Sequence, residues 1–266
     1  MTQLKRVLTI GGSDSSAGAG IQADLRTIAD FGCAGMSAIT ALTAQNTTGV
    51  HAVLPVAPDF VTAQIEAVFN DIGADAVKTG MLFDTPTVIS VAHAVETFSL
   101  PNLVVDPVMI AKGGHPLISI EALDALKSGL LPRAALVTPN IPEAEALTGR
   151  TIAGKHDMQE CAIAILQFGC KAVLIKGGHS TSDSCDDCLA WMVNGEPEIK
   201  WFKAPRISSD NTHGTGCTLS AAAAACLALG QRTDEAVASA KEYVTNALQA
   251  GTKLRLGAGI GAVKPI

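Results

Sequence analysis

The amino-acid sequence predicts an α/β fold in which a mostly parallel central sheet is covered by helices on both faces. Short runs rich in β-branched residues alternate with longer segments of helical periodicity, the order that produces parallel strands joined by crossover helices. Aromatic residues make up only 4% of the chain while alanine, valine and isoleucine are plentiful, which suits strands buried beneath close-packed helices. No repeat or linker-like tract divides the 266 residues, so we expect a single domain over residues 1–266.

The elements follow in order from these patterns. Short apolar runs predict strands over Val7–Ile10, Met36–Leu42, Ala74–Lys78, Leu103–Asp106, Leu136–Thr138 and Ala172–Lys176. Helical periodicity predicts helices over Ile21–Phe31, Phe60–Asp71, Pro86–Phe98, Ile120–Ser128, Pro142–Leu147, Met158–Phe168, Thr218–Leu229 and Asp234–Gln249. Ser119 before its helix, and Gly32 and Gly169 after theirs, are typical helix-end signals. Leu189–Val193 and Ile199–Lys203 flank Asn194-Gly195, which predicts a small hairpin at an edge of the sheet.

Composition and charge argue against several classes of protein. The net charge of −6 and the pI near 5.5 disfavour a nucleic-acid-binding protein, which normally carries a basic surface. The run Val7–Ile10 is too short for a signal-peptide core, and no segment reaches the roughly 20 apolar residues that span a membrane. Seven cysteines, an odd number, suggest free thiols and a cytoplasmic protein. Cys185-x-x-Cys188 lacks a second pair at zinc-finger spacing, which makes structural zinc the weaker interpretation.

The most informative stretch is Asn211–Thr218, which leads directly into an alanine-rich helical segment. Gly214 and Gly216 permit a tight turn with close backbone approach, and Thr215 and Cys217 lie in that turn, just before the predicted helix. Backbone N–H groups at a helix N-terminus point at whatever lies in front of them and bind anions well. The segment therefore predicts an anion cradle for phosphate or for a developing negative charge.

Cys217 differs from the other cysteines because it lies at this predicted helix N-terminus. A free thiol has a pKa of about 8.5, and a helix N-terminus lowers the pKa of a thiol. We therefore expect the pKa of Cys217 to be lowered enough for the thiol to act as a modest base. A neighbouring residue, His213, has two open interpretations, an ordinary loop histidine or a contact to a bound cofactor.

Two further loops follow the first and second strands. The glycine-rich loop 11–20 lacks the spacing of a dinucleotide fingerprint, and the chain has no G-x-x-x-x-G-K-[ST] phosphate loop. Loop 11–20 either turns the chain only or lies against a small ligand with Asp24 facing the pocket. Gln45 follows the second strand, and its amide carries both donors and an acceptor that can pair with an aminopyrimidine edge.

Acidic and basic residues come at the ends of the later strands. Asp106 ends the fourth strand, while Asn140 and Glu143 follow the fifth, and together they form an oxygen-rich set suited to Mg²⁺. Glu143 can alternatively only complement the dipole of the helix that it begins. Lys176, at the end of the sixth strand, can reach phosphates or simply be solvated, and Lys112 is a second mobile cation of the same kind.

Six blocks of sequence resemble one family. They are Gly12–Leu25, Ala41–Thr47, Val105–Met109, Thr138–Ala144, Lys176–His179 and Asn211–Ser220. In this order, from about Val7 to Leu229, they closely resemble the hydroxymethylpyrimidine/phosphomethylpyrimidine kinases of thiamine biosynthesis, within the ribokinase-like superfamily. The first loop departs from the common proline-serine-glycine-glycine, since residues 15–18 read Ser-Ser-Ala-Gly.

The resemblance implies a ribokinase-like fold, a homodimer, and the ATP- and Mg²⁺-dependent phosphorylation of 4-amino-5-hydroxymethyl-2-methylpyrimidine and then of its monophosphate. The substrate pocket that it implies consists of Gly12, Asp24, Gln45, Met81 and Val108. The implied catalytic anion hole runs from Gly214 to Cys217 and works with Lys176. The implied nucleotide and Mg²⁺ side consists of Asp106, Asn140, Glu143, Lys176 and His213, with Asp106 and Glu143 holding the metal through water.

Three alternatives remain from the sequence. A pyridoxine/pyridoxal kinase acts on a ring that also carries a hydroxymethyl group, although Gln45 suits an aminopyrimidine edge better. A non-catalytic pyrimidine-binding regulator has no need of an anion hole. A thiol hydrolase, with Cys217 and His213 as its pair, leaves the nucleotide-side residues unexplained.

Overall fold

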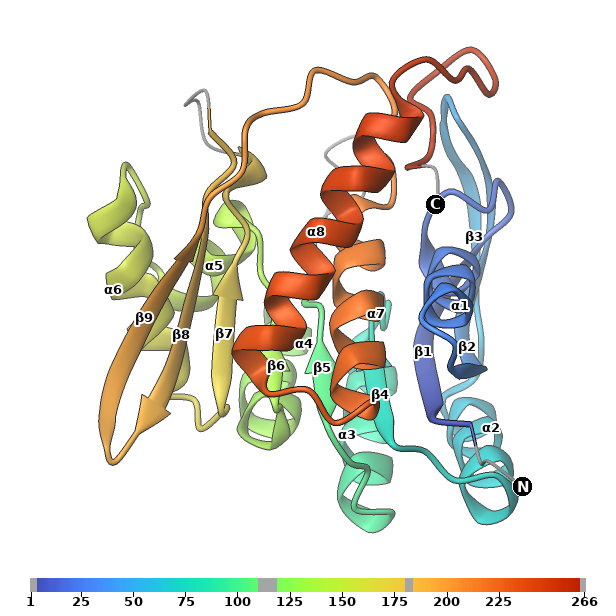
Figure 1. Ribbon diagram of the computed structural model, residues 1–266. Helices are drawn as coiled ribbons and strands as arrows, with labels where there is room; N and C mark the ends of the chain where they lie inside the picture. The colour runs from blue at the N-terminus through green and yellow to red at the C-terminus, as the bar shows by residue number, and fades with distance from the viewer. Residues whose placement is uncertain (1–3, 110–118, 180–183, 264–266) are drawn as a thin grey trace.

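The structure is a computed structural model that describes residues 4–109, 119–179 and 184–263 (Figure 1). One nine-stranded sheet runs through it, in the order β3-β2-β1-β4-β5-β6-β7-β8-β9. All pairings from β2 to β7 are parallel, while β3 at one edge and the β8–β9 hairpin at the other pair antiparallel. The strands are β1 (Arg6–Asp14), β2 (Ala34–Asn46), β3 (Gly49–Pro55), β4 (Ala76–Thr79), β5 (Leu103–Val105), β6 (Leu136–Val137), β7 (Ala172–Ile175), β8 (Asp187–Val193) and β9 (Glu196–Phe202).

Helices cover both faces of the sheet, which confirms the predicted α/β class. The helices are α1 (Gly20–Asp30), α2 (Pro58–Asp71), α3 (Thr85–Thr97), α4 (Ile120–Ala125), α5 (Ile141–Thr148), α6 (Lys155–Leu166), α7 (Thr215–Ala228) and α8 (Thr233–Gly251). One apolar core lies beneath α2 to α6, and a second lies beneath α1, α7 and α8. In the second core the alanines of α7 are fully buried, so α7 packs closely against the middle of the sheet (Figure 1). No helix of the described residues is long and apolar enough to cross a membrane.

The flap formed by β2 and β3 was not predicted. The expected strand ended at Leu42, but pairing with β3 carries β2 on to Asn46, so Gln45 lies in the strand and not in a following loop. Because β3 lies at the edge and most of its side chains are exposed or half-buried, it lacks the apolar run of a buried strand. The expected helix Ile120–Ser128 is α4 followed by a π-helical turn, Leu126–Leu130, and a short 3₁₀ turn.

Candidate active site

The functional candidates gather at one edge of the sheet. In a parallel sheet the carboxyl ends of the strands open onto a common crevice, and ligands bind there. Lys176 follows β7 directly, Asp106 follows β5, and Met81 comes two residues after β4. The start of α7 faces the same edge, since a Cβ atom added to Gly216 would lie 3.3 Å from Lys176 Nζ and 3.7 Å from Asp106 Oδ2.

The anion cradle has the geometry of an open helix N-terminus. Gly214 is the residue before α7 and has φ +80°, and a Cβ atom there would collide with the carbonyl oxygen of Gly18, so only glycine fits. The first full helical hydrogen bond runs from the Thr218 N–H to the Gly214 oxygen. The N–H groups of Gly216 and Cys217 have no acceptor among the described residues. These two donors are therefore available to an anion.

A cluster of three charged side chains lies beside the cradle. Lys176 Nζ lies 2.8 Å from Asp106 Oδ1 and 4.0 Å from Glu143 Oε2. Asp106 also accepts hydrogen bonds from Thr138 at 3.2 Å and from Ser220, on α7, at 3.3 Å. Both carboxylates are buried, while the Lys176 side chain keeps 14% exposure. The ammonium is thus the member of the cluster that reaches the open side.

Glu143 lies in the first turn of α5, where it caps the helix as one of its two predicted roles requires; its predicted role toward Mg²⁺ stays a prediction. It forms a capping box with Asn140: the Asn140 N–H donates to Glu143 Oε2 at 2.7 Å, and the Glu143 N–H donates to Asn140 Oδ1 at 2.9 Å. Burial raises the pKa of Glu143 to about 7, although the Lys176 charge acts to lower it. Glu143 therefore caps its helix and also lies within reach of the site lysine.

These carboxylates fit a cation held through water. One lysine faces two carboxylates, which leaves a net negative charge next to the cradle when both are ionised. The pKa of Glu143 is raised mainly by burial and further by the charge of Asp106. Mg²⁺ keeps several of its waters and is usually held by one or two carboxylates together with substrate phosphates. No set of three or more His, Cys, Asp or Glu side chains among the described residues is arranged to hold a metal by itself. Lys112 lies outside the described residues.

A cavity of about 290 Å³ opens on the other side of Lys176. Its walls come from Lys176 and Gly178 after β7, from residues 204–207, from Thr215 of α7, and from the α8 face that carries Val244 and Leu248. The volume is near the lower end of the ~300–1,000 Å³ that small-molecule sites occupy. Its apolar walls and the neighbouring lysine suit a nucleoside whose phosphates point toward the cradle.

Two residues of this cavity were missed by the sequence reasoning. Lys241 on α8 donates to Asp187 Oδ2 at 2.6 Å, and Asp187 Oδ1 accepts the Gly177 N–H at 2.8 Å. Asp187 thereby ties α8 to the turn that follows Lys176. No motif marked this pair, because α8 and β8 meet only in the tertiary structure. Cys185, half-buried, lines the same cavity, whereas Cys188 is buried in β8.

Of the residues expected to line the substrate pocket, Gly12 and Met81 lie together, since a Cβ atom on Gly12 would collide with the Met81 methyl group. Val108 lies at a hollow of about 10 Å³, room for roughly one water. Asp24, in contrast, does not face an open pocket. It is fully buried, accepts from Thr9 Oγ1 at 2.6 Å, and pairs with Lys78 Nζ at 2.8 Å.

Lys78, which the sequence reasoning placed in a strand without a role, is the largest fully buried side chain. A Cβ atom on Gly80 would lie 2.7 Å from its ammonium, so the glycine leaves room for it. The Asp24 charge raises the pKa of Lys78 against the effect of burial. The sequence of β4, Ala-Val-Lys-Thr, gives no sign that the lysine is buried, because its burial depends on Asp24 of α1.

The expectation that the pKa of the Cys217 thiol is lowered is wrong, because the pKa is raised. Burial raises the pKa of Cys217 to about 11, and the nearby charge of Lys78 and a backbone hydrogen bond from Gly20 lower it only in part. Desolvation of the thiolate, reinforced by the charges of Asp24 and Asp106, therefore outweighs the contributions that lower the pKa. The thiol is protonated at neutral pH.

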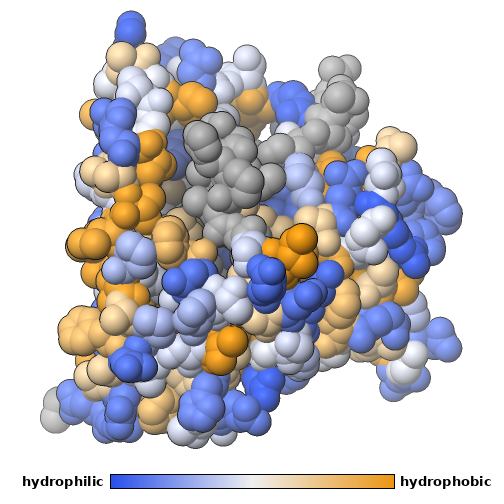
Figure 2. Space-filling model, turned by 180° about the vertical axis from the view of Figure 1, so that it is seen from behind, coloured by the Kyte–Doolittle hydropathy of each residue, from blue (hydrophilic) through white to orange (hydrophobic). Residues whose placement is uncertain are grey.

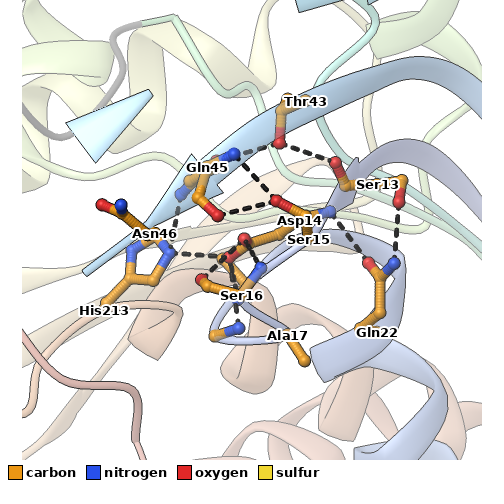
Figure 3. A network of polar contacts seen from close by, with 12 residues as sticks. Ser13, Asp14, Ser15, Ser16, Ala17, Gln22, Thr43, Gln45, Asn46 and His213 are labelled. Atoms are coloured by element: carbon orange, nitrogen blue, oxygen red, sulfur yellow. Dashed lines mark hydrogen bonds and ion pairs between the residues drawn. The ribbon is translucent and has the colours of Figure 1, made fainter. Parts of the chain in front are cut away.

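Gln45 and His213 lie together (Figure 3). The terminal amide of Gln45 lies 3.0 Å from His213 Nε2, and His213 Nε2 lies 2.9 Å from Asp14 Oδ2. His213 lies next to Gln45 and is not among the residues that line the cavity of about 290 Å³, so its contact to a bound cofactor stays a prediction. Asp14 was not singled out by the sequence, although it lies in the same glycine-rich loop.

Fold and site together define a ribokinase-like kinase: a mostly parallel sheet, a helix N-terminus open to phosphate and a nucleotide-sized cavity beside it. Within that class, the chain belongs to the phosphomethylpyrimidine kinase family, whose model matches residues 14–264. The hydroxymethylpyrimidine/phosphomethylpyrimidine kinase of Escherichia coli is 46% identical over 263 residues, which cover 98% of this chain and 97% of that protein.

Two further comparisons agree. The thiamine biosynthesis bifunctional protein ThiED of Geobacter sulfurreducens is 49% identical over 95% of this chain, and the chain spans about half (51%) of its length. The crystal structure of the phosphomethylpyrimidine kinase of Clostridium difficile matches with a TM-score of 0.79 and 44% identity, over 91% of this chain and 99% of that one.

A pyridoxal kinase is also a structural neighbour. The Staphylococcus aureus enzyme, in complex with AMP-PCP and pyridoxal, matches with a TM-score of 0.88 and 35% identity, over 98% of this chain and 93% of that one.

Proposed function

We propose that this kinase transfers the γ-phosphoryl group of ATP to 4-amino-5-hydroxymethyl-2-methylpyrimidine and then to the resulting monophosphate, which gives the pyrophosphate used in thiamine biosynthesis. The observation that carries the proposal is the position of the cradle. Its free N–H groups and Lys176 lie between the nucleotide-sized cavity and the side that carries Gln45. The family match and the relatives named for this activity support the same substrate.

In the first step the hydroxymethyl oxygen bonds to the γ-phosphorus while the bond between that phosphorus and the ADP oxygen breaks. The transition state is loose, so positioning and charge neutralisation contribute most of the catalysis. The N–H groups of Gly216 and Cys217 and the Lys176 ammonium are the donors that meet the phosphoryl oxygens. Because the Cys217 thiol is protonated, it does not take the alcohol proton, which leaves late and passes to an oxygen of the phosphoryl group in transfer.

The second step has a different acceptor. A phosphate monoester has a second pKa near 6 and is largely ionised at neutral pH, so it needs no base. The same cradle serves both acceptors, since neither step requires an ionised side chain at Cys217. Asp106 and Glu143 would hold Mg²⁺ through its waters, and the ion would add positive charge at the phosphates.

The test is a product assay. The protein is incubated with Mg-ATP and either the aminopyrimidine alcohol or pyridoxal, and mono- and diphosphorylated products are separated by anion-exchange chromatography. We expect the pyrimidine to give both products and pyridoxal to be the poorer substrate. Turnover of pyridoxal alone would assign the chain to the other kinase type, and turnover of neither would leave a binding protein.

We also propose that two copies of the chain associate through the β2–β3 flap. Leu42 and Leu54 lie directly opposite each other, so their side chains share a face, and they are 44% and 64% exposed. Phe60, at the start of α2, is 62% exposed. Apolar side chains gather along this edge in Figure 2, and the outer side of β3 offers unpaired backbone groups.

Oligomeric state is measured by analytical ultracentrifugation. We expect a dimer for the native chain and a shift to monomer for Leu54→Lys, with the exposed Ile89→Lys on α3 as a matched control. A dimer that survives Leu54→Lys places the interface elsewhere.

A cytoplasmic location completes the proposal. All seven cysteines are unpaired, and five of them are buried apolar side chains in the two cores. Free thiols in this number persist in a reducing compartment.

A further inference from the structure

A chain of polar contacts joins the first loop to the expected substrate-reading residue (Figure 3). Asp14 Oδ2, His213 Nε2 and the Gln45 amide follow one another at 2.9 and 3.0 Å. Asp14 is buried and accepts further hydrogen bonds from the N–H groups of Ser16 and Ala19. Three segments far apart in sequence therefore converge on Gln45.

The His213 ring is held from several sides. Its backbone N–H donates to the Gly261 oxygen, and its backbone oxygen accepts the Val263 N–H, both at 3.0 Å, so the C-terminal segment pins the residue. One ring edge packs on Gly18, where a Cβ atom would collide with His213 Cδ2. With Asp14 at Nε2, the imidazole has one orientation open to it. A side chain on a mobile loop has no need of such support.

The neighbours of Gln45 decide which end of its amide faces which group. Burial acts to raise the pKa of Asp14, but hydrogen bonds from His213 and Ser16 outweigh it and lower the pKa to about 2, so the carboxylate only accepts. His213 Nε2 must then carry a proton and has no lone pair, so the Gln45 atom 3.0 Å from it must be the oxygen, which shares this one N–H with Asp14 Oδ2. Thr43 Oγ1, 3.2 Å from the other end of the amide, already donates to the Ser13 oxygen and must accept from Gln45.

Both neighbours thus require the same orientation, in which Gln45 Oε1 faces His213 and Nε2 faces Thr43, the reverse of the amide drawn in Figure 3. The two ends of an amide are distinguished by such partners and not by shape. In this orientation one lone pair of Gln45 Oε1 accepts from His213, and one N–H of Gln45 Nε2 donates to Thr43. The second lone pair of Oε1 and the second N–H of Nε2 remain available to a ligand.

The remaining pair matches an aminopyrimidine edge, which offers an amino N–H and a ring nitrogen. It matches pyridoxal poorly, because the phenolate and aldehyde oxygens of that ring both accept. We propose that His213, held by Asp14, is a specificity-determining positioning residue that fixes the Gln45 amide in the orientation that reads an aminopyrimidine and disfavours a pyridoxal-type ring. This inference rests on the proposed function and assigns to His213 a role on the acceptor side.

The test compares two substitutions at one position. His213→Phe keeps a planar ring but removes the donor, whereas His213→Gln places an amide N–H near the position of Nε2. His156→Phe, at an exposed histidine on α6, is the matched control. For each variant kcat/KM is measured with the pyrimidine alcohol and with pyridoxal, together with KM for ATP and pyrimidine binding by calorimetry without nucleotide.

We expect His213→Phe to lower the pyrimidine-to-pyridoxal ratio of kcat/KM about tenfold and to weaken pyrimidine binding by a similar factor, the effect of one lost or misdirected hydrogen bond. KM for ATP stays unchanged, His213→Gln recovers most of the ratio, and His156→Phe matches the native protein. An unchanged ratio in His213→Phe overturns the inference, as does an equal loss in His213→Gln.

If His213→Phe does not fold, as judged by its melting temperature, Asp14→Asn provides the second test. It removes the requirement for a proton on Nε2 while keeping the shape, and a reduced ratio is again expected. A native protein that phosphorylates no pyrimidine contradicts the proposed function itself. A native protein that does so, with variants of unchanged ratio, contradicts only the role of His213.

Discussion

Two buried aspartate–lysine pairs lie on either side of the start of α7, and they differ in what surrounds them. Asp24–Lys78 and Asp106–Lys176 have the same separation, 2.8 Å between Nζ and the carboxylate oxygen. The first pair is closed, with side-chain exposures of 0% and 1%, whereas Lys176 keeps 14%. Lys176 also faces a second carboxylate, Glu143, while Asp24 Oδ1 has no hydrogen-bond partner among the described residues.

The difference in the exposure of the two lysines indicates a structural role for Asp24–Lys78 and access to a ligand for Lys176. A lysine sealed among protein atoms can only neutralise its partner, and losing either member leaves a charge without compensation. A lysine at the wall of a cavity can turn from a carboxylate to a bound phosphate at little cost, because the phosphate supplies the negative charge that the carboxylate supplied before. Cys217 lies between the two lysines, and its charge state is coupled to both.

The largest expected effect is on catalysis at the open pair. We expect Lys176→Ala to lower kcat by about 10³-fold, the loss that follows removal of one phosphoryl-stabilising donor. Its melting temperature should change little, because Asp106 keeps hydrogen bonds from Thr138 and Ser220. Steady-state kinetics and calorimetry measure both, and Lys171→Ala, at an exposed lysine just before β7, is the control. If Lys176→Ala lowered the melting temperature strongly but retained kcat in its folded fraction, Lys176 would have a structural role and no catalytic one.

The closed pair is expected to show the opposite result. Lys78→Met leaves Asp24 as an uncompensated buried charge, and we expect a loss of about 3–5 kcal/mol in the free energy of unfolding. The double variant Asp24→Asn/Lys78→Met carries no buried charge, and Thr9 can still donate to the amide oxygen, so most of the stability should return. Urea denaturation measures the three proteins. A double variant as unstable as Lys78→Met would show that the pair is not the cause.

A smaller effect is expected between the pairs. Because the pKa of Cys217 is raised to about 11, we expect Cys217→Ala to slow each phosphorylation by about tenfold or less. A general base contributes typically 10²–10⁴-fold, and only to the alcohol acceptor. Single-turnover rates for both steps decide the matter. A loss in that larger range confined to the first step would restore the thiol as a base.

The smallest expected effect is the pH dependence of the open pair. Burial raises the pKa of Glu143 from 4.5 to about 7, so the folded chain holds a proton that the unfolded chain releases. Stability from this proton is complete below about pH 4.5 and is lost as the pH rises through 7. Relative to the native protein, Glu143→Gln should therefore gain melting temperature from pH 4.5 to 7. The exposed Glu242→Gln is the control and should show no such trend.

Much of the fold could be predicted from the sequence, because each central element carries its own periodicity. The six strands from β1 to β7 that form the parallel sheet, the eight α-helices and the edge hairpin all lie close to the expected ranges. The β2–β3 flap escaped because an exposed edge strand has no apolar run. The turn at Gly214 could be predicted because glycine is the residue that such a turn requires. The structure gives the reason, since φ is positive at Gly214 and a Cβ atom there would collide with Gly18.

Charge states and partners were beyond the sequence. The sequence suggested that Asp24 faces a pocket, but the structure pairs it with Lys78. It also suggested a lowered pKa for the Cys217 thiol, but burial raises that pKa. The contacts of His213 to Asp14 and Gln45 could not be predicted either, because the three residues come together only in the tertiary structure.

The sequence by itself therefore determined the parallel sheet, the glycine turn at the start of α7 and the residue types around it, because these depend on local geometry and periodicity. Only the tertiary structure decided which lysine is sealed and which is open, whether the thiol is ionised, and which way the Gln45 amide points. Those properties depend on desolvation and on hydrogen-bond partners that lie tens to nearly two hundred residues apart, such as Gln45 and His213 at a separation of 168. No local pattern encodes them.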